Sequence, residues 1–233
     1  MNTSDLRAAL RLVNEARDLP QGSPQQREYV LRSLAALTHA QVGVWAEVER
    51  GRILPAIDFG WSGERERAVF DEYLKGRVHL ADPSLPEMVK RLPTPVVVAA
   101  RHDLVGDREW YGSAHVQELR RPARVDAFLY AGWQDGSRMS ALALHRAWGD
   151  KPFGERERAL VEAICLECSF LRAPLLPPRL SEVLTLLSRG LSEKQIAAEL
   201  SLSAHTVHDY VKALHRRFGV RSRGELLAAA LRG

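Results

Sequence analysis

The sequence is poor in cysteine and has neither a long apolar run nor a repeat. Its two cysteines, Cys165 and Cys168, exclude a disulfide framework and favour a reducing compartment. No apolar stretch approaches the ~18 residues that span a bilayer, so no contact with a membrane is expected. The first residues are polar and charged, without an apolar signal core, which predicts a cytoplasmic protein.

Signatures of catalysis are missing as well. The eight histidines show no spacing typical of metal ligands. We find no pairing of a nucleophile with a base and no phosphate-binding loop. Cys165 and Cys168 lie on a predicted helix among apolar residues, which indicates two buried thiols rather than a redox or metal site. We therefore expect no enzyme, no catalytic residue, no metal and no cofactor.

The positive charge is concentrated in the last quarter of the chain. Of the 33 basic and 29 acidic residues, nine and five lie in residues 173–233, which leaves 24 of each for residues 1–172. A neutral N-terminal part followed by a net charge of +4 is typical of a nucleic-acid-binding tail, although the excess is small.

A domain boundary is predicted at "RAPLLPPRL", residues 172–180, because three prolines in five positions cannot continue a helix. We assign residues 1–172 to an N-terminal domain, 173–179 to a proline-rich linker, and 180–233 to a C-terminal domain. A chain of 233 residues is long enough for two such domains.

The N-terminal part mixes helical and alternating patterns. Helical spacing occurs at residues 5–19, 24–39, 62–76, 106–119 and 153–172, and strand-like alternation at 41–49, 53–60, 94–101, 124–133 and 138–148. Turns are expected around Glu49-Arg50-Gly51-Arg52 and Gln134-Asp135-Gly136-Ser137. Strands in the middle with helices at both ends predict an α+β fold, an antiparallel sheet with flanking helices.

The C-terminal part has unusually complete helix signals. Pro178 can begin a helix that Gly190 ends, and Ser192 with Gln195 forms a capping box for the next. Ser203 caps a third helix after a three-residue turn. Ser222 with Glu225 opens a fourth helix in the same way as Ser192 with Gln195. The sequence therefore predicts an all-α unit of four short helices.

The third of these helices is amphipathic. Its apolar residues fall at helical spacing: Val207, Tyr210, Val211, Leu214 and Phe218. A polar stripe lies on the other side: His205, His208, Asp209, Lys212 and Arg216. Such stripes are usually solvated faces. Two short helices joined by a tight turn, with small residues on the first, nevertheless indicate a helix-turn-helix, whose second helix enters the major groove of DNA.

The segment from Glu182 to Leu231 resembles the DNA-binding domain of LuxR-type transcription regulators. The matching positions are Glu182, Gly190, Ile196, Ala197, Leu202, Thr206, Val207, Leu214, Gly219 and Val220. Two positions depart from the family's pattern: Leu180 stands where the family usually has an acidic residue, and Tyr210 stands where it often has a histidine. Neither departure touches the polar stripe.

The resemblance implies that double-stranded DNA is the partner. The implied DNA-binding residues are Lys194, Ser203, His205, Thr206, His208, Asp209, Lys212 and Arg216. His208, Asp209 and Lys212 would meet base edges, and Thr206 with nearby basic residues would hold phosphates. Lysine can donate to guanine and aspartate can accept from cytosine. Asp209 has an alternative role, since it could offset the positive end of its helix or pair with Lys212 or a histidine.

One reading helix covers only a few base pairs, so a homodimer on a two-fold site is expected. Leu226, Leu227 and Ala230 on the fourth helix are the candidate dimerisation residues. The alternative for them is packing onto the first helix of the same unit.

The N-terminal part resembles a GAF-like or PAS-like sensor domain, most clearly in "ALALHRAWGDKPFGERERALVEAI", which is similar to the last strand and closing helix of GAF domains. Residues 1–41 lack the acidic cluster of phospho-accepting receiver domains. The resemblance implies a domain that senses a small molecule or mediates dimerisation. A ligand-independent regulator with a purely protein-binding N-terminal domain is the alternative.

A narrower alternative is a quorum-sensing regulator that responds to acyl-homoserine lactones. Tyr73 and Asp82-Pro83 have the spacing of that family's tyrosine and Asp-Pro, but Val69 and Val97 stand where its two tryptophans are expected. Coincidence is the better explanation for half a constellation. Together with Trp110 and Tyr111, which lie in a stretch rich in polar and aromatic residues, Tyr73 and Asp82 are the candidate ligand-binding residues.

Overall fold

The computed structural model describes residues 2–20, 23–49, 52–54, 56–75, 82–92, 96–135, 138–168 and 176–232. Residues 1–10 with 30–167 form one compact unit, here called the sheet unit. Residues 11–29 with 168–233 form a second, here called the helical unit. Within the described ranges, no helix combines the length and the apolar character that crossing a bilayer requires.

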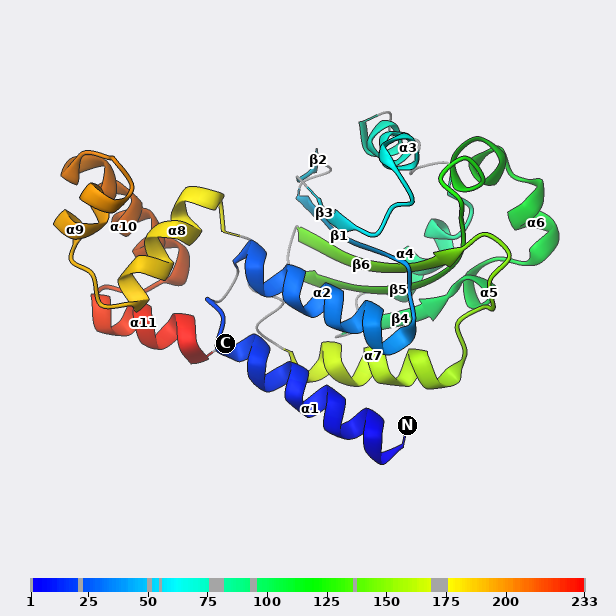
Figure 1. Ribbon diagram of the computed structural model, residues 1–233, viewed down its shortest axis with the longest axis horizontal. Helices are drawn as coiled ribbons and strands as arrows, with labels where there is room; N and C mark the ends of the chain where they lie inside the picture. Colours follow the sequence, from blue (N-terminus) through cyan, green and yellow to red (C-terminus); the bar gives the residue numbers. More distant parts are fainter. Residues whose placement is uncertain are drawn as a thin grey trace. The chain divides into compact units, whose positions relative to one another are not determined.

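An antiparallel sheet forms the centre of the sheet unit (Figure 1). Its strands are β1 (Val42–Glu49), β2 (Arg52–Ile53), β3 (Ile57–Phe59), β4 (Val97–Ala100), β5 (Val125–Asp135) and β6 (Arg138–Ala147). They pair in the order β2–β1–β6–β5–β4, and β3 pairs with the first half of β1. The predicted α+β class is confirmed. The predicted β5–β6 hairpin is confirmed in register from Asp135 opposite Arg138, while Gly136 and Ser137 of its turn lie outside the described residues.

Helices lie on both faces of this sheet. The helices of the N-terminal part are α1 (Thr3–Arg17), α2 (Pro24–Thr38), α3 (Glu64–Lys75), α4 (Leu85–Arg91), α5 (Arg101–Leu104), α6 (Asp107–Gly112), the π-helix η2 (Val116–Arg120) and α7 (Glu155–Glu167). In Figure 1, α7 runs along one face of the sheet and α3 lies over the other. Val69 and Phe70 of α3 pack against a small core that includes Val44 and Val125.

One prediction for this region was wrong in detail, and two short helices were not predicted. The single helix predicted over residues 106–119 is broken at Ser113, whose backbone is extended at φ −79° and ψ 145°. The Ser113 hydroxyl bonds both to the carbonyl of Trp110 and to the amide of Val116, so it stabilises the break. The short helices α4 and α5 were not predicted, because four to seven residues are too few for a periodic pattern.

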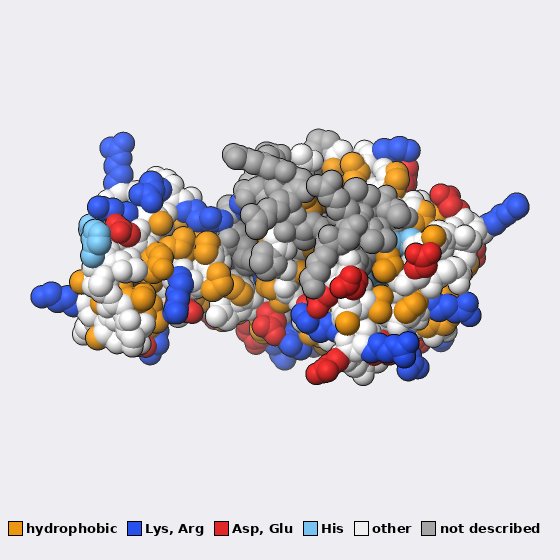
Figure 2. Space-filling view, turned by 90° about the horizontal axis from the view of Figure 1, so that it is seen from above, with side chains coloured by type: hydrophobic (Ala, Val, Ile, Leu, Met, Phe, Trp, Pro, Cys, Tyr) orange, Lys and Arg blue, Asp and Glu red, His pale blue; other side chains and the backbone are white. Residues whose placement is uncertain are grey.

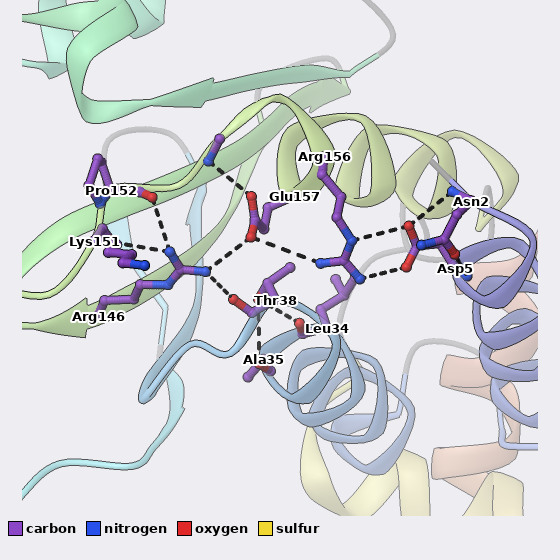
Figure 3. A network of polar contacts seen from close by, with 11 residues as sticks. Asn2, Asp5, Leu34, Ala35, Thr38, Arg146, Lys151, Pro152, Arg156 and Glu157 are labelled. Atoms are coloured by element: carbon purple, nitrogen blue, oxygen red, sulfur yellow. Dashed lines mark hydrogen bonds and ion pairs between the residues drawn. The ribbon is translucent and has the colours of Figure 1, made fainter.

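Within the sheet unit, a polar network ties the start of α1, the end of α2 and α7 to β6 (Figure 3). Arg146 on β6 donates to the carbonyl of Thr38 at 2.6 Å and to Glu157 at 3.2 Å. Arg156 on α7 forms a two-point contact with Asp5, with its shorter distance at 2.5 Å. Desolvation raises the pKa of Glu157. Hydrogen bonds from the backbone and from Arg146 lower it by more, so the net shift is downward. The carboxylates therefore stay ionised and hold the helices in place.

The helical unit carries the four predicted C-terminal helices: α8 (Pro178–Ser188), α9 (Glu193–Glu199), α10 (Ala204–Phe218) and α11 (Arg223–Arg232). The capping box of Ser192 and Gln195 is present, and Ser203 accepts from the amide of Thr206 at 3.0 Å. Gly190 and Gly219 end α8 and α10 with φ of +91° and +66°, angles that glycine adopts at little cost. These sequence predictions are confirmed.

Two details of the helical unit add to the predictions. Ser222 caps the amide of Glu225, but the Glu225 carboxylate accepts from the amide of Arg221 at 2.8 Å, one residue before the predicted partner. Residues 173–175 of the predicted linker lie outside the described residues. Leu176, within that predicted linker, is already buried in the core of α8–α11. The domain boundaries drawn from the sequence stay a prediction.

Candidate DNA interface and ligand cavity

Helix α10 has one buried side and one exposed side. Val207, Val211 and Leu214 are buried in the core of the helical unit, with Tyr210 and Phe218 packed at its margin. The exposed side holds the whole predicted stripe: His205, His208, Asp209, Lys212 and Arg216. The structure thus brings the predicted DNA-facing residues together on one surface, with the N-terminal end of the helix capped by Ser203.

Contacts within the stripe fix some of these side chains. His208 Nδ1 lies 3.1 Å from Glu193 Oε2, so a residue of α9 orients a residue of α10. His205 Nε2 lies 3.6 Å from Asp209 Oδ2, one turn along the same helix. This proximity fits the alternative role for Asp209, in which its carboxylate pairs with a histidine. Lys194 is exposed on α9, and Thr206, half-buried, shares a hydrogen bond with the hydroxyl of Ser203.

The surface of α8–α11 carries mixed charge. Figure 2 shows Lys and Arg side chains on this part of the chain, with a histidine and an acidic side chain close together among them. Ammonium and guanidinium groups on such a face can neutralise phosphates, and histidine, aspartate and lysine can read base edges. The arrangement therefore suits a helix that reads DNA.

The predicted dimerisation residues divide into two kinds. Leu226 and Ala230 are buried in the core of their own unit, whereas Leu227 is only partly buried against it. The packing alternative thus describes Leu226 and Ala230. Only Leu227 of the three keeps surface that a second copy could cover.

A cavity of about 150 Å³ lies in the sheet unit, on the face of the sheet covered by α3. Its wall is mainly apolar and comes from β1, β5, β6, α3, α4 and η2, with residues such as Val44, Val69, Phe70, Met88 and Ala143. Four polar side chains with ring or guanidinium groups also line it: His115, Arg120, Tyr130 and His145. An apolar cavity with a few converging polar groups is the usual form of a small-molecule site.

The polar side chains of the wall belong to a buried cluster built around Arg120. The Arg120 guanidinium donates from Nε to His115 Nε2 at 3.0 Å, from Nη1 to His145 Nδ1 at 3.1 Å, and from Nη2 to Asp82 Oδ2 at 3.1 Å. It also donates to the hydroxyl of Tyr130, which donates to Asp82 Oδ2 at 3.3 Å. Arg120 is the last residue of η2, and π-helical turns recur at functional sites.

Burial and charge shift the pKa of Asp82 and of both histidines. Burial would raise the pKa of Asp82, but Arg120, His115 and hydrogen bonds from Ser84 outweigh it and hold the pKa below its ordinary value. Burial and the neighbouring Arg120 lower the pKa of His115 to about 4 and that of His145 well below its ordinary value. The cluster thus holds one cation, one anion and two neutral imidazoles at neutral pH.

Of the predicted ligand-binding residues that the structure describes, Asp82, Trp110 and Tyr111 do not line this cavity. The side chain of Tyr73 lies outside the described part of α3. Asp82 is buried and does not line the cavity, but it contacts three residues that do, Arg120, Tyr130 and His115. Trp110 is buried behind the wall, where its ring centroid lies 5.4 Å from the Arg120 guanidinium carbon and 5.7 Å from the His115 ring, and it donates to Asp126 at 3.1 Å. Tyr111 donates to the same carboxylate at 2.7 Å, and desolvation followed by Asp126 raises its pKa to about 12.

Sequence reasoning missed Arg120, Tyr130 and His145 in the cavity wall, whereas His115 lies in the stretch rich in polar and aromatic residues that the sequence pointed to. Tyr130 and His145 sit at inward positions of predicted strands, so a polar residue in an apolar face was an available signal. Arg120, in "VQELRRPAR", has the pattern of a surface residue and gave none. Both cysteines are buried thiols, as predicted.

The C-terminal segment matches a known family. Residues 174–230 match the family described as "Bacterial regulatory proteins, luxR family". The chain is 46% identical over 54 residues to "Response regulator Rre1" of Synechocystis sp. (strain ATCC 27184 / PCC 6803 / Kazusa), covering 23% of each protein. The chain thus spans less than a quarter of the length of the curated relatives it matches.

Two solved structures resemble all or most of the chain. "SdiA in complex with octanoyl-rac-glycerol" is 13% identical with a TM-score of 0.50, covering 99% of this chain and 97% of that one. The N-acylhomoserine lactone dependent LuxR family transcription factor CepR2 from Burkholderia cenocepacia is 17% identical with a TM-score of 0.50, covering 76% and 99%. At these identities the likeness concerns the fold. The exposed stripe on α10, the cap at its N-terminal end and the family match all point to the same conclusion. The chain carries the DNA-binding helix-turn-helix of the LuxR family of bacterial regulatory proteins.

Proposed function

We propose that this protein is a sequence-specific DNA-binding transcription regulator that acts as a homodimer in the cytoplasm, where it can reach the chromosome. The observation that carries the proposal is the exposed polar face of α10 within a segment that matches the LuxR family. That family is a class of regulators rather than of enzymes.

The proposed contacts follow from the geometry of α10. His208, Asp209 and Lys212 project from the exposed side and are assigned to base edges. A second group is assigned to phosphates and to the capped helix end: Lys194, Ser203, His205, Thr206 and Arg216. Helix N-termini and cationic side chains both favour phosphate oxygens.

The test of DNA binding is selection of sites by the full chain from a random pool of double-stranded DNA. We expect enrichment of a two-fold symmetric sequence, with an affinity that falls steeply as salt is raised because counterions are released. A variant with Lys212→Ala and Arg216→Ala is the matched control and should enrich nothing. No enrichment by the natural chain at low ionic strength would overturn the proposal.

The homodimer is proposed from the size of the site, with Leu227 on α11 as the surface residue to test. Leu227→Glu should leave the α8–α11 core in place, because Leu227 is only partly buried. The matched control is Leu226→Glu, which should unfold that core, since Leu226 is fully buried. Analytical ultracentrifugation of the DNA complex should show two copies of the natural chain and weakened pairing for Leu227→Glu. An unchanged dimer would remove α11 from the interface.

We further propose that the sheet unit senses a small molecule in the cavity beside α3. Support comes from the apolar wall with its converging polar side chains, and from the shared fold with SdiA, whose structure was solved with octanoyl-rac-glycerol. The test is to measure the melting temperature of the full chain with each member of a metabolite panel, together with its mass in solution. These measurements distinguish ligand sensing from a role in protein association alone. A ligand should shift melting without changing mass.

The acyl-homoserine-lactone alternative receives less support from the geometry. Val69, which stands where that family has a tryptophan, lines the cavity and offers no hydrogen-bond donor. Asp82, which matches the family's aspartate, is buried behind the wall. Val69 thus departs from the residue type that the alternative requires, and Asp82 has the right type but does not line the cavity.

A further inference from the structure

One histidine of the exposed stripe is held by a residue outside its own helix. His208 Nδ1 on α10 lies 3.1 Å from Glu193 Oε2 on α9, which is within hydrogen-bonding distance. His205, the other histidine of the stripe, lies 3.6 Å from Asp209, which is too far for a hydrogen bond. Of the two histidines, only His208 therefore has a directional contact that fixes its ring.

The position of Glu193 is set by the start of its own helix and by the core beneath it. Glu193 is the first residue of α9, directly after the cap residue Ser192, which forms the capping box with Gln195. Ile196 of α9 and Val207 of α10 are both fully buried in the core of the helical unit. The cap and the core thus hold the carboxylate against the stripe on α10.

The contact also decides where the His208 ring carries its proton. A carboxylate only accepts hydrogen bonds, so His208 Nδ1 must donate to Glu193. In a neutral imidazole the other nitrogen then has no proton and is an acceptor. That nitrogen, Nε2, is bonded by none of the described residues, and the His208 side chain is 48% exposed. The stripe thus presents one ring nitrogen that accepts a hydrogen bond.

An acceptor in the major groove distinguishes bases by their amino groups. Adenine N6 and cytosine N4 are donors there, whereas guanine offers acceptors at O6 and N7 and thymine offers one at O4. An imidazole nitrogen without a proton can bond to adenine or cytosine, and it is repelled by the acceptors of guanine. The ammonium of Lys212, four positions further along α10, only donates and therefore has the opposite preference.

We infer that Glu193 is a positioning residue for base reading: it holds His208 in the tautomer whose Nε2 accepts, so that His208 selects adenine or cytosine against guanine. This inference rests on the proposed DNA-binding function and adds a residue of α9 to its specificity. Glu193 acts through His208 rather than on a base. The alternative role for Glu193 is to offset the positive end of α9, which would change stability but not the choice of base.

The experiment uses the full chain and the DNA site that it selects from a random pool, at about pH 8, where an ordinary imidazole is neutral. The base pair that His208 reads is the one whose preference His208→Ala abolishes. Dissociation constants for each of the four bases at that position are then measured by gel shift. We expect a preference of about fivefold for adenine or cytosine over guanine, the contribution of one hydrogen bond. A preference for guanine, or no position that depends on His208, overturns the inference.

Removal of the carboxylate tests the part played by Glu193. Glu193→Ala frees the ring to carry its proton on either nitrogen, so the preference should fall to within about twofold. In a His208→Ala background, Glu193→Ala should change the preference no further. Glu199→Ala is the matched control, because Glu199 is an exposed carboxylate of the same helix that pairs with Arg189 at 3.8 Å. This control should alter binding to all four bases alike, through charge alone.

The ratio between bases separates the positioning role from a structural one. Any loss of helix stability in Glu193→Ala lowers the four affinities together and leaves their ratio unchanged, so it cannot imitate the expected result. If the natural chain enriches no site, the proposed DNA-binding function fails and the inference fails with it. If the natural chain enriches a site whose base preferences are the same in Glu193→Ala, only the inference is overturned.

Discussion

The two units use the same kinds of side chain under opposite conditions of exposure. In the sheet unit, Asp82, Arg120 and His115 are packed together, and the Asp82 side chain is 0% exposed. In the helical unit, the His205 and Asp209 side chains lie on a helix surface and are 84% and 57% exposed. Both regions hold an acid beside a base, yet only the first is closed to water.

This difference decides what each region can respond to. Removing one partner of a buried ion pair leaves an uncompensated charge and costs about 3–5 kcal/mol, whereas an exposed pair contributes about 0.2–1 kcal/mol. The exposed stripe on α10 can therefore exchange its own contacts for contacts with DNA at little cost. The buried cluster is fixed by its internal hydrogen bonds and senses only what enters the cavity beside it.

The largest expected effect tests the buried side of the comparison. Arg120→Ala should lower the free energy of unfolding of the sheet unit by about 3–5 kcal/mol, because Asp82 remains buried without its partner. All five tryptophans lie between residues 45 and 148, so urea unfolding followed by tryptophan fluorescence reports on this unit alone. Arg216→Ala on α10 is the matched control and should leave the transition unchanged. A loss below about 1 kcal/mol for Arg120→Ala would mean that the cluster is open to water.

The next effect concerns pH. The folded pKa of His115 is about 4, below its ordinary value of 6.5, so the fold favours the neutral ring. The stability from this preference is complete above pH 6.5 and is lost as pH falls from 6.5 towards 4. The loss is on the order of 3 kcal/mol for His115, and His145 adds to it in the same direction.

The pH effect is measured by urea unfolding with tryptophan fluorescence at pH values between 7 and 4. His115→Gln should flatten the dependence, since glutamine keeps polar atoms but does not titrate. His205→Gln, on the exposed stripe, is the matched control and should not. Equal flattening by both variants would contradict the assignment of the effect to the buried cluster.

The third effect tests the exposed side. Lys212→Ala should weaken binding to a selected DNA site by about 1–3 kcal/mol if the lysine contacts a base, with no change in the tryptophan unfolding curve. Binding is measured by gel shift at two salt concentrations. Arg179→Ala provides the control, because Arg179 is an exposed arginine of α8 that pairs with Glu182 at 2.7 Å. Equal losses for both variants would reduce the role of Lys212 to general charge.

The same contrast explains what the sequence could predict. The face of α10 follows from local periodicity and caps, so the sequence alone assigns His205, Asp209 and Lys212 to one surface. The buried cluster joins Asp82 to Arg120, 38 positions away, and to His145, 25 positions further on. Those contacts depend on the register of β5 and β6 and on a π-helical turn, none of which has a local signature. The Asp-Pro motif drew attention to Asp82, but the pairing of Asp82 with Arg120 could not be predicted from the sequence.

The smallest expected effect decides between the two roles of Asp209. If Asp209 accepts a hydrogen bond from a cytosine, Asp209→Ala should lower discrimination between the selected site and a single-base change by about 1 kcal/mol, while binding to unrelated DNA becomes tighter. If Asp209 only pairs with His205, at 3.6 Å, then Asp209→Ala and His205→Ala should change binding to all sequences alike. Competition gel shifts with the matched and mismatched sites distinguish these outcomes. A uniform change would place Asp209 with the other exposed pairs that contribute little, and the reading of bases would then fall to His208 and Lys212.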